Sequence, residues 1–143
     1  MESGKLWGGN MIKLILFILL LFNINTAMAI PSYRVVDGDT IEIKDPNAPI
    51  SILKTIKSHR LYGIDTPELK GKCKKERELA LKAKYFTQNF ITLNSQIFYH
   101  QKLDKYGRFL IEIKNNNKDL ATELVVAGLA VYYEGDAKYN WCQ

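Results

Sequence analysis

Apolar and polar residues alternate along several short segments after residue 32, a pattern typical of β-strands with one buried face. The first alternation, from Tyr33 to Ile43, is interrupted by the turn-forming pair Asp37-Gly38 and predicts two strands or one bent hairpin. Further strands are predicted over residues 50–56, 60–64, 96–101 and 108–114. The last two are expected to pair as a β-hairpin, and the asparagines at 115–117 end its second strand.

Two segments follow the helical period instead. Residues 74–93 are predicted to form a helix, because its apolar residues recur at spacings of four and three. The predicted apolar face of this helix consists of Leu79, Ala83, Phe86, Phe90 and Leu93. A second helix is predicted from a cap at Asp119 through Ala127, where Gly128 follows as a usual terminating residue. This order of elements fits an α+β domain, mainly β, in which a small five-stranded barrel packs against two or more helices.

The N-terminal part of the chain has the features of an export signal. An apolar run over residues 14–22 follows Lys13 and precedes the small-x-small sequence Ala27-Met28-Ala29. We predict cleavage after Ala29, so that residues 1–29 are a signal peptide and residues 30–143 form one secreted or periplasmic domain without stable membrane association. An uncleaved membrane anchor is the alternative, and Met11 is an alternative start of the signal.

Charge and cysteine content fit an exported domain that meets polyanions. Residues 30–143 contain 18 basic and 14 acidic residues, a net charge of +4. Such an excess raises the local concentration of nucleic acid, although solvated lysines are also ordinary surface residues. Cys73 and Cys142 are the two cysteines, and an even pair in an oxidising compartment favours one disulfide, with two free or buried thiols as the alternative.

Three short segments concentrate acidic and arginine residues: 36–40, 60–68 and 104–108. Asp39, Asp65 and Glu68 supply hard carboxylate oxygens suited to calcium or magnesium, and no cluster of histidine and cysteine indicates zinc. Arg60 and Arg108 are candidate phosphate ligands, because a guanidinium stays charged and donates paired hydrogen bonds. Taken singly, each aspartate also fits an ordinary turn and each arginine a surface ion pair.

The two histidines, His59 and His100, do not form a nucleophile-base arrangement with a serine or cysteine, so we expect structural roles for them.

Together, the three segments resemble the active-site signatures of the staphylococcal nuclease-like, or thermonuclease, family. The resemblance covers residues 33–131 and rests on Asp39, on Arg60-x-x-x-x-Asp65 with Thr66-Pro67-Glu68, and on Asp104-Lys105-Tyr106-Gly107-Arg108. It implies a five-stranded OB-fold barrel and calcium-dependent hydrolysis of DNA and RNA. Nothing in the sequence requires an oligomer, and a monomer is expected.

The resemblance also implies residue roles. Asp39 and Asp65 would bind calcium through their side chains and Thr66 through its backbone carbonyl, while Glu68 would position or deprotonate the attacking water. Arg60 and Arg108 would hold the scissile phosphate, with Lys105 and Tyr106 near a neighbouring phosphate. The alternative is a non-catalytic OB-fold module that binds nucleic acid. Such a module is expected to lose some of the catalytic residues, and this chain keeps them.

Features near the C-terminus resemble short exported members of the family. These members carry Gly-x-Cys after the second signature, here Gly71-Lys72-Cys73, and end near Trp-Cys, here Trp141-Cys142. The resemblance implies a Cys73–Cys142 disulfide that replaces the long terminal helix of other members. Tyr132 and Tyr133 are either base-stacking residues or core residues.

Overall fold

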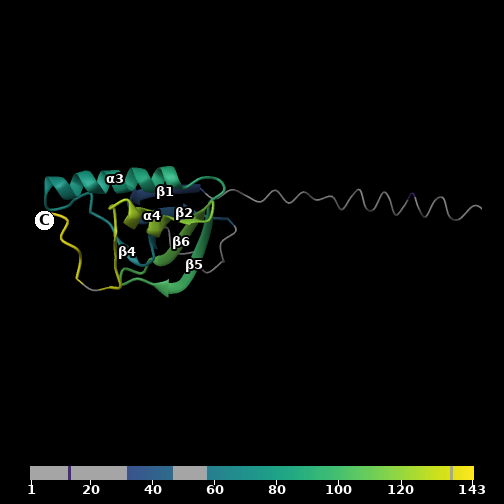
Figure 1. Cartoon of the computed structure of the whole chain (residues 1–143). Helices are drawn as coiled ribbons and strands as arrows, with labels where there is room; N and C mark the ends of the chain where they lie inside the picture. The colour runs from purple at the N-terminus through teal and green to yellow at the C-terminus, as the bar shows by residue number, and fades with distance from the viewer. Residues whose placement is uncertain (1–12, 14–31, 47–57, 136) are drawn as a thin grey trace, which may run out of the picture.

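The computed structural model describes residues 13, 32–46, 58–135 and 137–143. Within them, a twisted sheet is covered on one side by the long helix α3 (Lys74–Phe90), which packs on β1, and the shorter helix α4 (Leu120–Val126) packs against both α3 and β6 (Figure 1). The predicted strand at 50–56 and all of the predicted signal peptide except Lys13 lie outside the described residues. No helix in the described ranges is long and apolar enough to span a membrane.

The main sheet has the strand order β1-β2-β3-β6-β5. Its strands are β1 (Ser32–Asp37), β2 (Thr40–Lys44), β3 (Ser58–Leu61), β6 (Phe109–Asn115) and β5 (Gln96–Leu103). Among the described strands, β3 and β6 alone pair in parallel, and the predicted hairpin of β5 and β6 is confirmed. Three short strands complete the described part: β7 (Lys118–Asp119) pairs antiparallel with β6, while β4 (Ile64–Asp65) pairs with β8 (Val131–Tyr132).

This arrangement confirms the predicted α+β class with an OB fold: in the described residues, β1, β2, β3, β6 and β5 form the row, β7 is the sixth strand of the sheet, and two helices pack on it. Between the described residues of β1 and β5, the outermost strands, no pairing closes the sheet into a continuous barrel. The predicted strand over residues 60–64 is divided in the structure, because Gly63 takes a positive φ of 74° between β3 and β4. Glycine adopts this conformation without the steric cost of a Cβ atom.

Helix α3 ends earlier than the sequence pattern predicts. Its C-cap, Ile91, is extended and buried, so the chain leaves the helix there to keep Ile91 in the core. Leu93, which we assigned to the apolar face, is 76% exposed, and that assignment is wrong. The predicted limits of α4 are confirmed, since Asp119 caps its first turn at Thr122 and Gly128 follows it with a φ of 69°.

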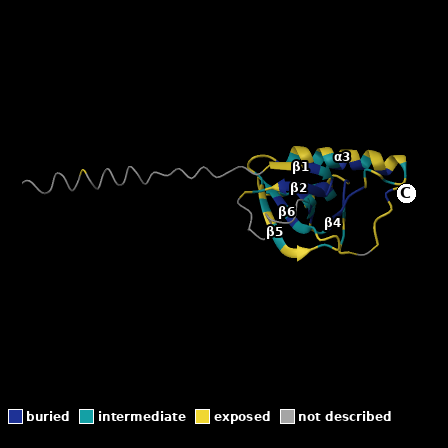
Figure 2. Cartoon of the chain, turned by 180° about the vertical axis from the view of Figure 1, so that it is seen from behind, coloured by how far each residue is buried: buried dark blue, intermediate teal, exposed yellow. Residues whose placement is uncertain are grey.

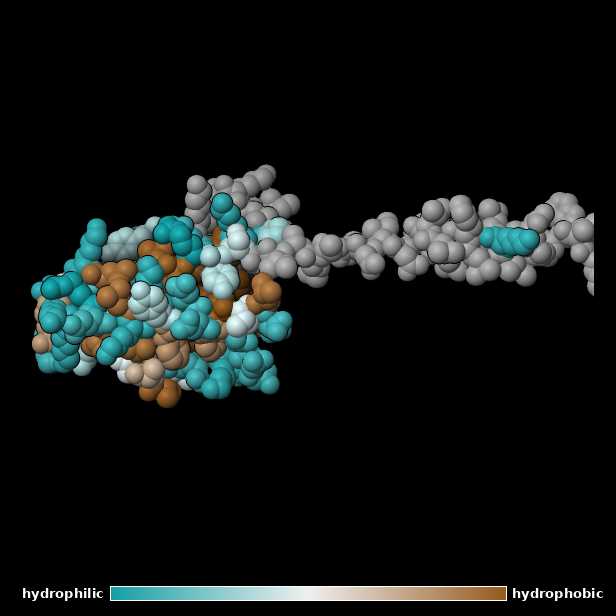
Figure 3. All heavy atoms as spheres, turned by 90° about the horizontal axis from the view of Figure 1, so that it is seen from above, coloured by the Kyte–Doolittle hydropathy of each residue, from teal (hydrophilic) through white to brown (hydrophobic). Residues whose placement is uncertain are grey.

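The core lies between the inner face of the sheet and the two helices, where Figure 2 shows buried residues in dark blue. It is formed by alternate residues of the strands and by one face of each helix, among them Ile41, Leu61, Ile111, Ile113, Ala83, Leu120 and Leu124. Full burial of one such aliphatic side chain stabilises the fold by about 1.5–3 kcal/mol. On the surface seen in Figure 3, hydrophilic residues are interspersed with hydrophobic ones.

A close approach between α3 and the β1–β2 turn positions the candidate site. A Cβ atom on Gly38 would lie 2.7 Å from the Cβ of Ala83, so only glycine lets the turn come this near the helix. The buried Thr87 hydroxyl donates to the Gly38 carbonyl at 2.7 Å. The turn that carries Asp39 is therefore fixed against a rigid element.

Candidate active site

An open cleft of about 1390 Å³ gathers most of the residues that the sequence singled out. Those that line it are Asp39, Arg60, Glu68, Lys105, Tyr106 and Arg108. They come from the β1–β2 turn, from β3, from the loop after β4 and from the β5–β6 turn. Asp65 and Thr66 are buried and are not part of the lining of the cleft.

Arg60 links the two predicted metal ligands. Its Nη1 donates to Asp39 Oδ2 at 2.6 Å and its Nη2 to Asp65 Oδ1 at 3.1 Å, and Nη2 also donates to the Ile64 carbonyl at 2.9 Å. The Thr66 backbone N–H donates to Asp39 Oδ2 at 3.2 Å. The structure therefore brings Asp39, Asp65 and Thr66 together around one guanidinium.

The surroundings shift the pKa values of this group. Burial acts to lower the pKa of Arg60, but the charges of Asp39 and Asp65 outweigh it and raise the value. Burial raises the pKa of Asp65, and the positive charges of Lys138 and Arg60 only partly offset that effect. Two carboxylates in so buried a place favour an additional cation, because uncompensated buried charge is costly.

Asp37, which we predicted only as a turn residue, is a third carboxylate beside Asp39. Burial, together with the charge of Asp39, raises the pKa of Asp37 to about 6. Its Oδ1 is buried without a hydrogen-bond partner. A set of carboxylates with one unpartnered oxygen fits a hard divalent cation such as calcium or magnesium. The position of Asp37 and Asp39 on either side of one glycine is the sequence signal that could have indicated that both carboxylates belong to the site.

Glu68 follows the predicted metal ligands Asp65 and Thr66 in the loop after β4. It is half exposed and lines the cleft. The ammonium of Lys138 contacts Glu68 and lies 3.7 Å from Asp65 Oδ1. Burial acts to lower the pKa of Lys138, but the bond to Glu68 and the nearby negative charges raise it. Sequence reasoning missed Lys138, because a contact across 70 residues leaves no local pattern.

Arg108 is held by Asp104, the acidic residue of its own turn. Asp104 Oδ2 accepts from Arg108 Nε at 2.7 Å, and Asp104 Oδ1 accepts the backbone N–H groups of Tyr106 and Arg108, both at 2.9 Å. Arg108 Nη1 also donates to Thr40 Oγ1 at 3.2 Å. Burial would raise the pKa of Asp104, but the bonds from Arg108 and Tyr106 lower it. Asp104 thus orients the guanidinium toward the β1–β2 turn.

Lys105 and Tyr106 form the exposed rim beside Arg108. The Tyr106 ring lies 5.2 Å from Lys105 Nζ and 5.4 Å from Arg108 Cζ, measured to the ring centroid. Two cations next to one aromatic ring suit contact with a phosphate or a base. Tyr132 and Tyr133 also line the cleft, and Tyr132 is 71% exposed, so it is not a core residue.

The histidines lie outside the lining of the cleft, in line with the structural roles expected for them. His59 is buried with its ring 5.7 Å from that of Tyr99, and His100 Nε2 lies 3.0 Å from Glu112 Oε1.

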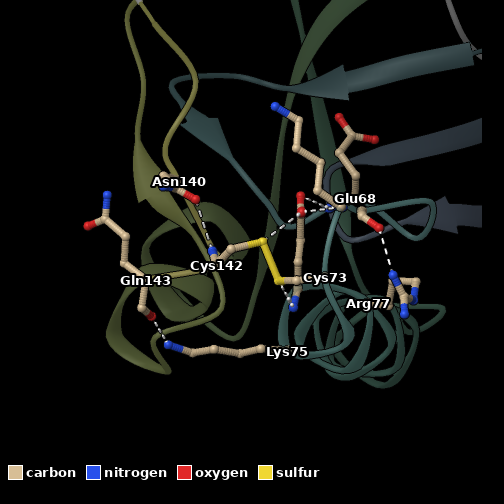
Figure 4. Close-up of a disulfide and its surroundings, with 10 residues drawn as sticks. Glu68, Cys73, Lys75, Arg77, Asn140, Cys142 and Gln143 are labelled. Carbon is tan, nitrogen blue, oxygen red and sulfur yellow. Dashed lines mark hydrogen bonds between the residues drawn. A yellow bond between two sulfur atoms is a disulfide. The ribbon is translucent and has the colours of Figure 1, made fainter.

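The structure contains the predicted Cys73–Cys142 disulfide, with the two Cα atoms 6.0 Å apart (Figure 4). The alternative of two free thiols is therefore wrong. The bond joins the residue that caps α3 to the C-terminal segment, where the buried Trp141 ring packs against Tyr139. It is adjacent to the loop that carries Glu68.

Comparison with known proteins agrees with this geometry. A probable endonuclease of Schizosaccharomyces pombe is 35% identical over 85 residues, an alignment that covers 54% of this chain and 37% of the yeast protein. The chain thus spans less than half the length of that relative. The model of the family described as staphylococcal nuclease homologue matches residues 58–141, more than half of the chain. The chain belongs to the staphylococcal nuclease homologue family.

Proposed function

We propose that the domain is a calcium-dependent nuclease that hydrolyses phosphodiester bonds in DNA and RNA. The observation that carries the proposal is the meeting of Arg60, Glu68 and Arg108 at one cleft, beside the buried pair Asp39 and Asp65. Family membership and the likeness to a probable endonuclease support nuclease activity. The choice of calcium and of both nucleic acids comes from the family resemblance.

Asp39 and Asp65 would hold the metal ion, with Thr66 contributing its backbone carbonyl. An ion bound there supplies a positive charge that neutralises phosphate and lowers the pKa of a bound water. The carboxylate set fits calcium better than zinc, because hard oxygen donors are present and the described cysteines are bonded to each other.

Glu68 would act as the general base. Its side chain is half exposed, whereas Asp39 and Asp65 are buried, so water can reach its carboxylate. A carboxylate within hydrogen-bond distance of a water accepts its proton as the oxygen attacks phosphorus. Lys138 would have to leave the Glu68 carboxylate, or share it, when the water binds.

Arg60 and Arg108 would stabilise the charge that develops on the phosphate oxygens. Both guanidinium groups are held in place before substrate binds, Arg60 by two carboxylates and Arg108 by Asp104. Preorganised donors of this kind contribute about 10²- to 10³-fold each to the rate. The leaving oxygen takes its proton from solvent in this scheme.

A binding module without catalysis is the second candidate. The observation that favours it is the contact of Lys138 with Glu68, which occupies the proposed base. Such a module would retain affinity for nucleic acid through Lys105, Arg108 and the exposed Tyr132.

A nuclease assay separates the two candidates. Single-stranded DNA and RNA are incubated with the full chain and with residues 30–143 in calcium, magnesium or chelator, and Glu68→Ala serves as the contamination control. Cleavage that needs calcium and falls at least 100-fold in Glu68→Ala supports the enzyme. Tight binding without cleavage under every condition supports the binding module.

We further propose that the domain is exported as a monomer after removal of residues 1–29. The disulfide supports this location, because such bonds persist mainly in oxidising compartments. Intact-mass spectrometry of the protein from the periplasm or medium tests cleavage after Ala29, and size-exclusion chromatography tests the monomer. Recovery of the uncut chain in the membrane fraction would contradict the proposal.

A further inference from the structure

Glu76, in the first turn of α3, is a buried acidic residue that faces the loop carrying Glu68. Its Oε2 accepts the backbone N–H of Lys72 at 2.8 Å, and its Oε1 accepts the backbone N–H of Glu68 at 3.4 Å. One carboxylate therefore holds both ends of residues 68–72. Figure 4 shows Glu68 beside the Cys73–Cys142 disulfide.

The loop is shaped to receive this carboxylate. A Cβ atom on Gly71 would lie 2.4 Å from Glu76 Cδ, so a larger residue would force the two apart. The Gly71 N–H donates to the Glu68 carbonyl at 2.8 Å, and Arg77 Nη1 donates to the Gly71 carbonyl at 3.0 Å. Glu76 and Arg77, consecutive residues of α3, thus both bind the loop of residues 68–72.

The disulfide supports the same carboxylate. Cys73 Sγ accepts the Glu76 backbone N–H at 3.4 Å, and Cys142 Sγ lies 3.7 Å from Glu76 Oε2. Two sulfurs and a carboxylate so close together could suggest a metal site. The sulfurs are bonded to each other and are not thiolates, so the cluster acts as a support for Glu76 instead.

We propose that Glu76 is a positioning residue that fixes the loop of residues 68–72 and so aims the Glu68 carboxylate at the cleft. This inference rests on the proposed function. Glu68 is half exposed and its carboxylate contacts the Lys138 ammonium, so the direction of the side chain depends on its backbone as well as on that ion pair. A displacement of about 1 Å in a reacting group can cost about 10²-fold in rate.

The test compares Glu76→Ala with Glu78→Ala, a control two residues further along the same helix whose exposed carboxylate pairs with Lys74. We expect Glu76→Ala to lower kcat about tenfold or more, with KM for DNA and calcium affinity by calorimetry within about threefold of wild type. Glu78→Ala should match wild type. Glu76→Gln keeps one acceptor oxygen and should recover part of kcat.

Gly71→Ala tests the same contact from the loop side. It leaves Glu76 chemically intact but displaces its carboxylate, so we expect a similar loss of kcat and no further loss in the double variant with Glu76→Ala. Circular dichroism and thermal melting establish that each variant is folded. A folded Glu76→Ala variant with wild-type kcat would overturn the proposal.

Amide hydrogen exchange keeps the inference separate from the proposed function. Loss of protection at the Glu68 and Lys72 amides in Glu76→Ala, but not in Glu78→Ala, would show that the carboxylate fixes the loop. Unchanged protection would overturn the inference even in an active enzyme. An inactive wild-type protein would instead remove the proposed function, and exchange would still decide whether Glu76 holds the loop.

Discussion

Arg60 Nη1 lies 2.6 Å from Asp39 Oδ2, and this ion pair is almost completely withdrawn from solvent. The same guanidinium reaches Asp65 Oδ1 at 3.1 Å. Arg60 therefore keeps two buried carboxylates side by side while its own charge remains at the cleft. In the proposed mechanism it has two roles, one in holding the metal ligands and one in binding phosphate.

Replacing Arg60 with alanine should destabilise the fold strongly when calcium is absent. Removing one partner of a buried ion pair leaves uncompensated charge, and the cost is about 3–5 kcal/mol. Calcium should restore more stability to Arg60→Ala than to wild type, because it would neutralise Asp39 and Asp65 in place of the guanidinium. Guanidinium chloride unfolding in chelator and in calcium measures both effects. Equal stability of the two proteins in chelator would contradict this role of Arg60.

Replacing Asp37 with asparagine should stabilise the metal-free protein at neutral pH. The folded-state pKa of Asp37 is raised to about 6 from 3.8, so the folded state holds the proton more tightly than the unfolded state. This contribution is fully present below about pH 4 and is lost as pH rises through about 6.

Asp37→Asn should therefore exceed wild type in unfolding free energy by about 1 kcal/mol at pH 7.5, after allowance for solvent screening, and match it near pH 3.5. Thermal unfolding of both proteins in chelator, between these two pH values, measures the difference in stability. A variant that is less stable than wild type at pH 7.5 would show that the ionised carboxylate stabilises the fold.

The sequence predicts the site better than it predicts how the site is supported. Asp39, Arg60 and Arg108 stand in short motifs at or near strand ends, where the OB fold brings neighbouring turns to one cleft. Glu76 and Lys138 act through contacts that tertiary structure creates, and neither has a distinctive neighbour pattern. Leu93 fitted the helical period, but burial of Ile91 ended the helix before it. Local periodicity alone does not predict which of two nearby apolar residues, Ile91 or Leu93, is buried in the core.

Replacing Asp104 with asparagine should weaken both stability and turnover at neutral pH. The folded-state pKa of Asp104 is lowered, so its contribution is present above about pH 4 and is lost as pH falls through the folded-state value. We expect Asp104→Asn to lose about 1–3 kcal/mol at pH 7, since hydrogen bonds to a charged group are removed. The deficit should shrink as the pH is lowered below the ordinary carboxyl range in urea unfolding, and kcat at neutral pH should fall because Arg108 loses its orienting partner. A deficit that is independent of pH would contradict the role of the charge.

Replacing Lys138 with methionine should strengthen calcium binding. The Lys138 ammonium contacts Glu68 and lies near Asp65, so it competes with a divalent cation for the same negative charge. We expect the calcium dissociation constant to fall about tenfold, which corresponds to about 1.4 kcal/mol. Isothermal titration calorimetry measures it, with Lys118→Met as the control, because Lys118 pairs with Glu123 on the surface. Unchanged affinity in Lys138→Met would mean that the ammonium does not compete.

Replacing both cysteines with serine should remove a large part of the stability. The disulfide joins residues separated by 69 positions, and a loop of this length restricts the unfolded chain enough to stabilise the fold by about 4 kcal/mol. The variant Cys73→Ser/Cys142→Ser should lose roughly that amount in denaturant unfolding, and reduction of the wild-type protein should produce a similar loss.

The hydrogen bonds of Glu76 show whether the disulfide only restricts the unfolded chain or also fixes the loop of residues 68–72 in the folded state. If the bond only restricts the unfolded chain, the folded serine variant keeps the Glu76 bonds to Glu68 and Lys72, and kcat is unchanged under conditions where it is folded. If the bond also supports the Glu76 carboxylate, kcat falls and the amides of Glu68 and Lys72 lose protection from exchange. We expect the second result, because Cys142 Sγ lies 3.7 Å from Glu76 Oε2 and Cys73 caps the turn that carries it.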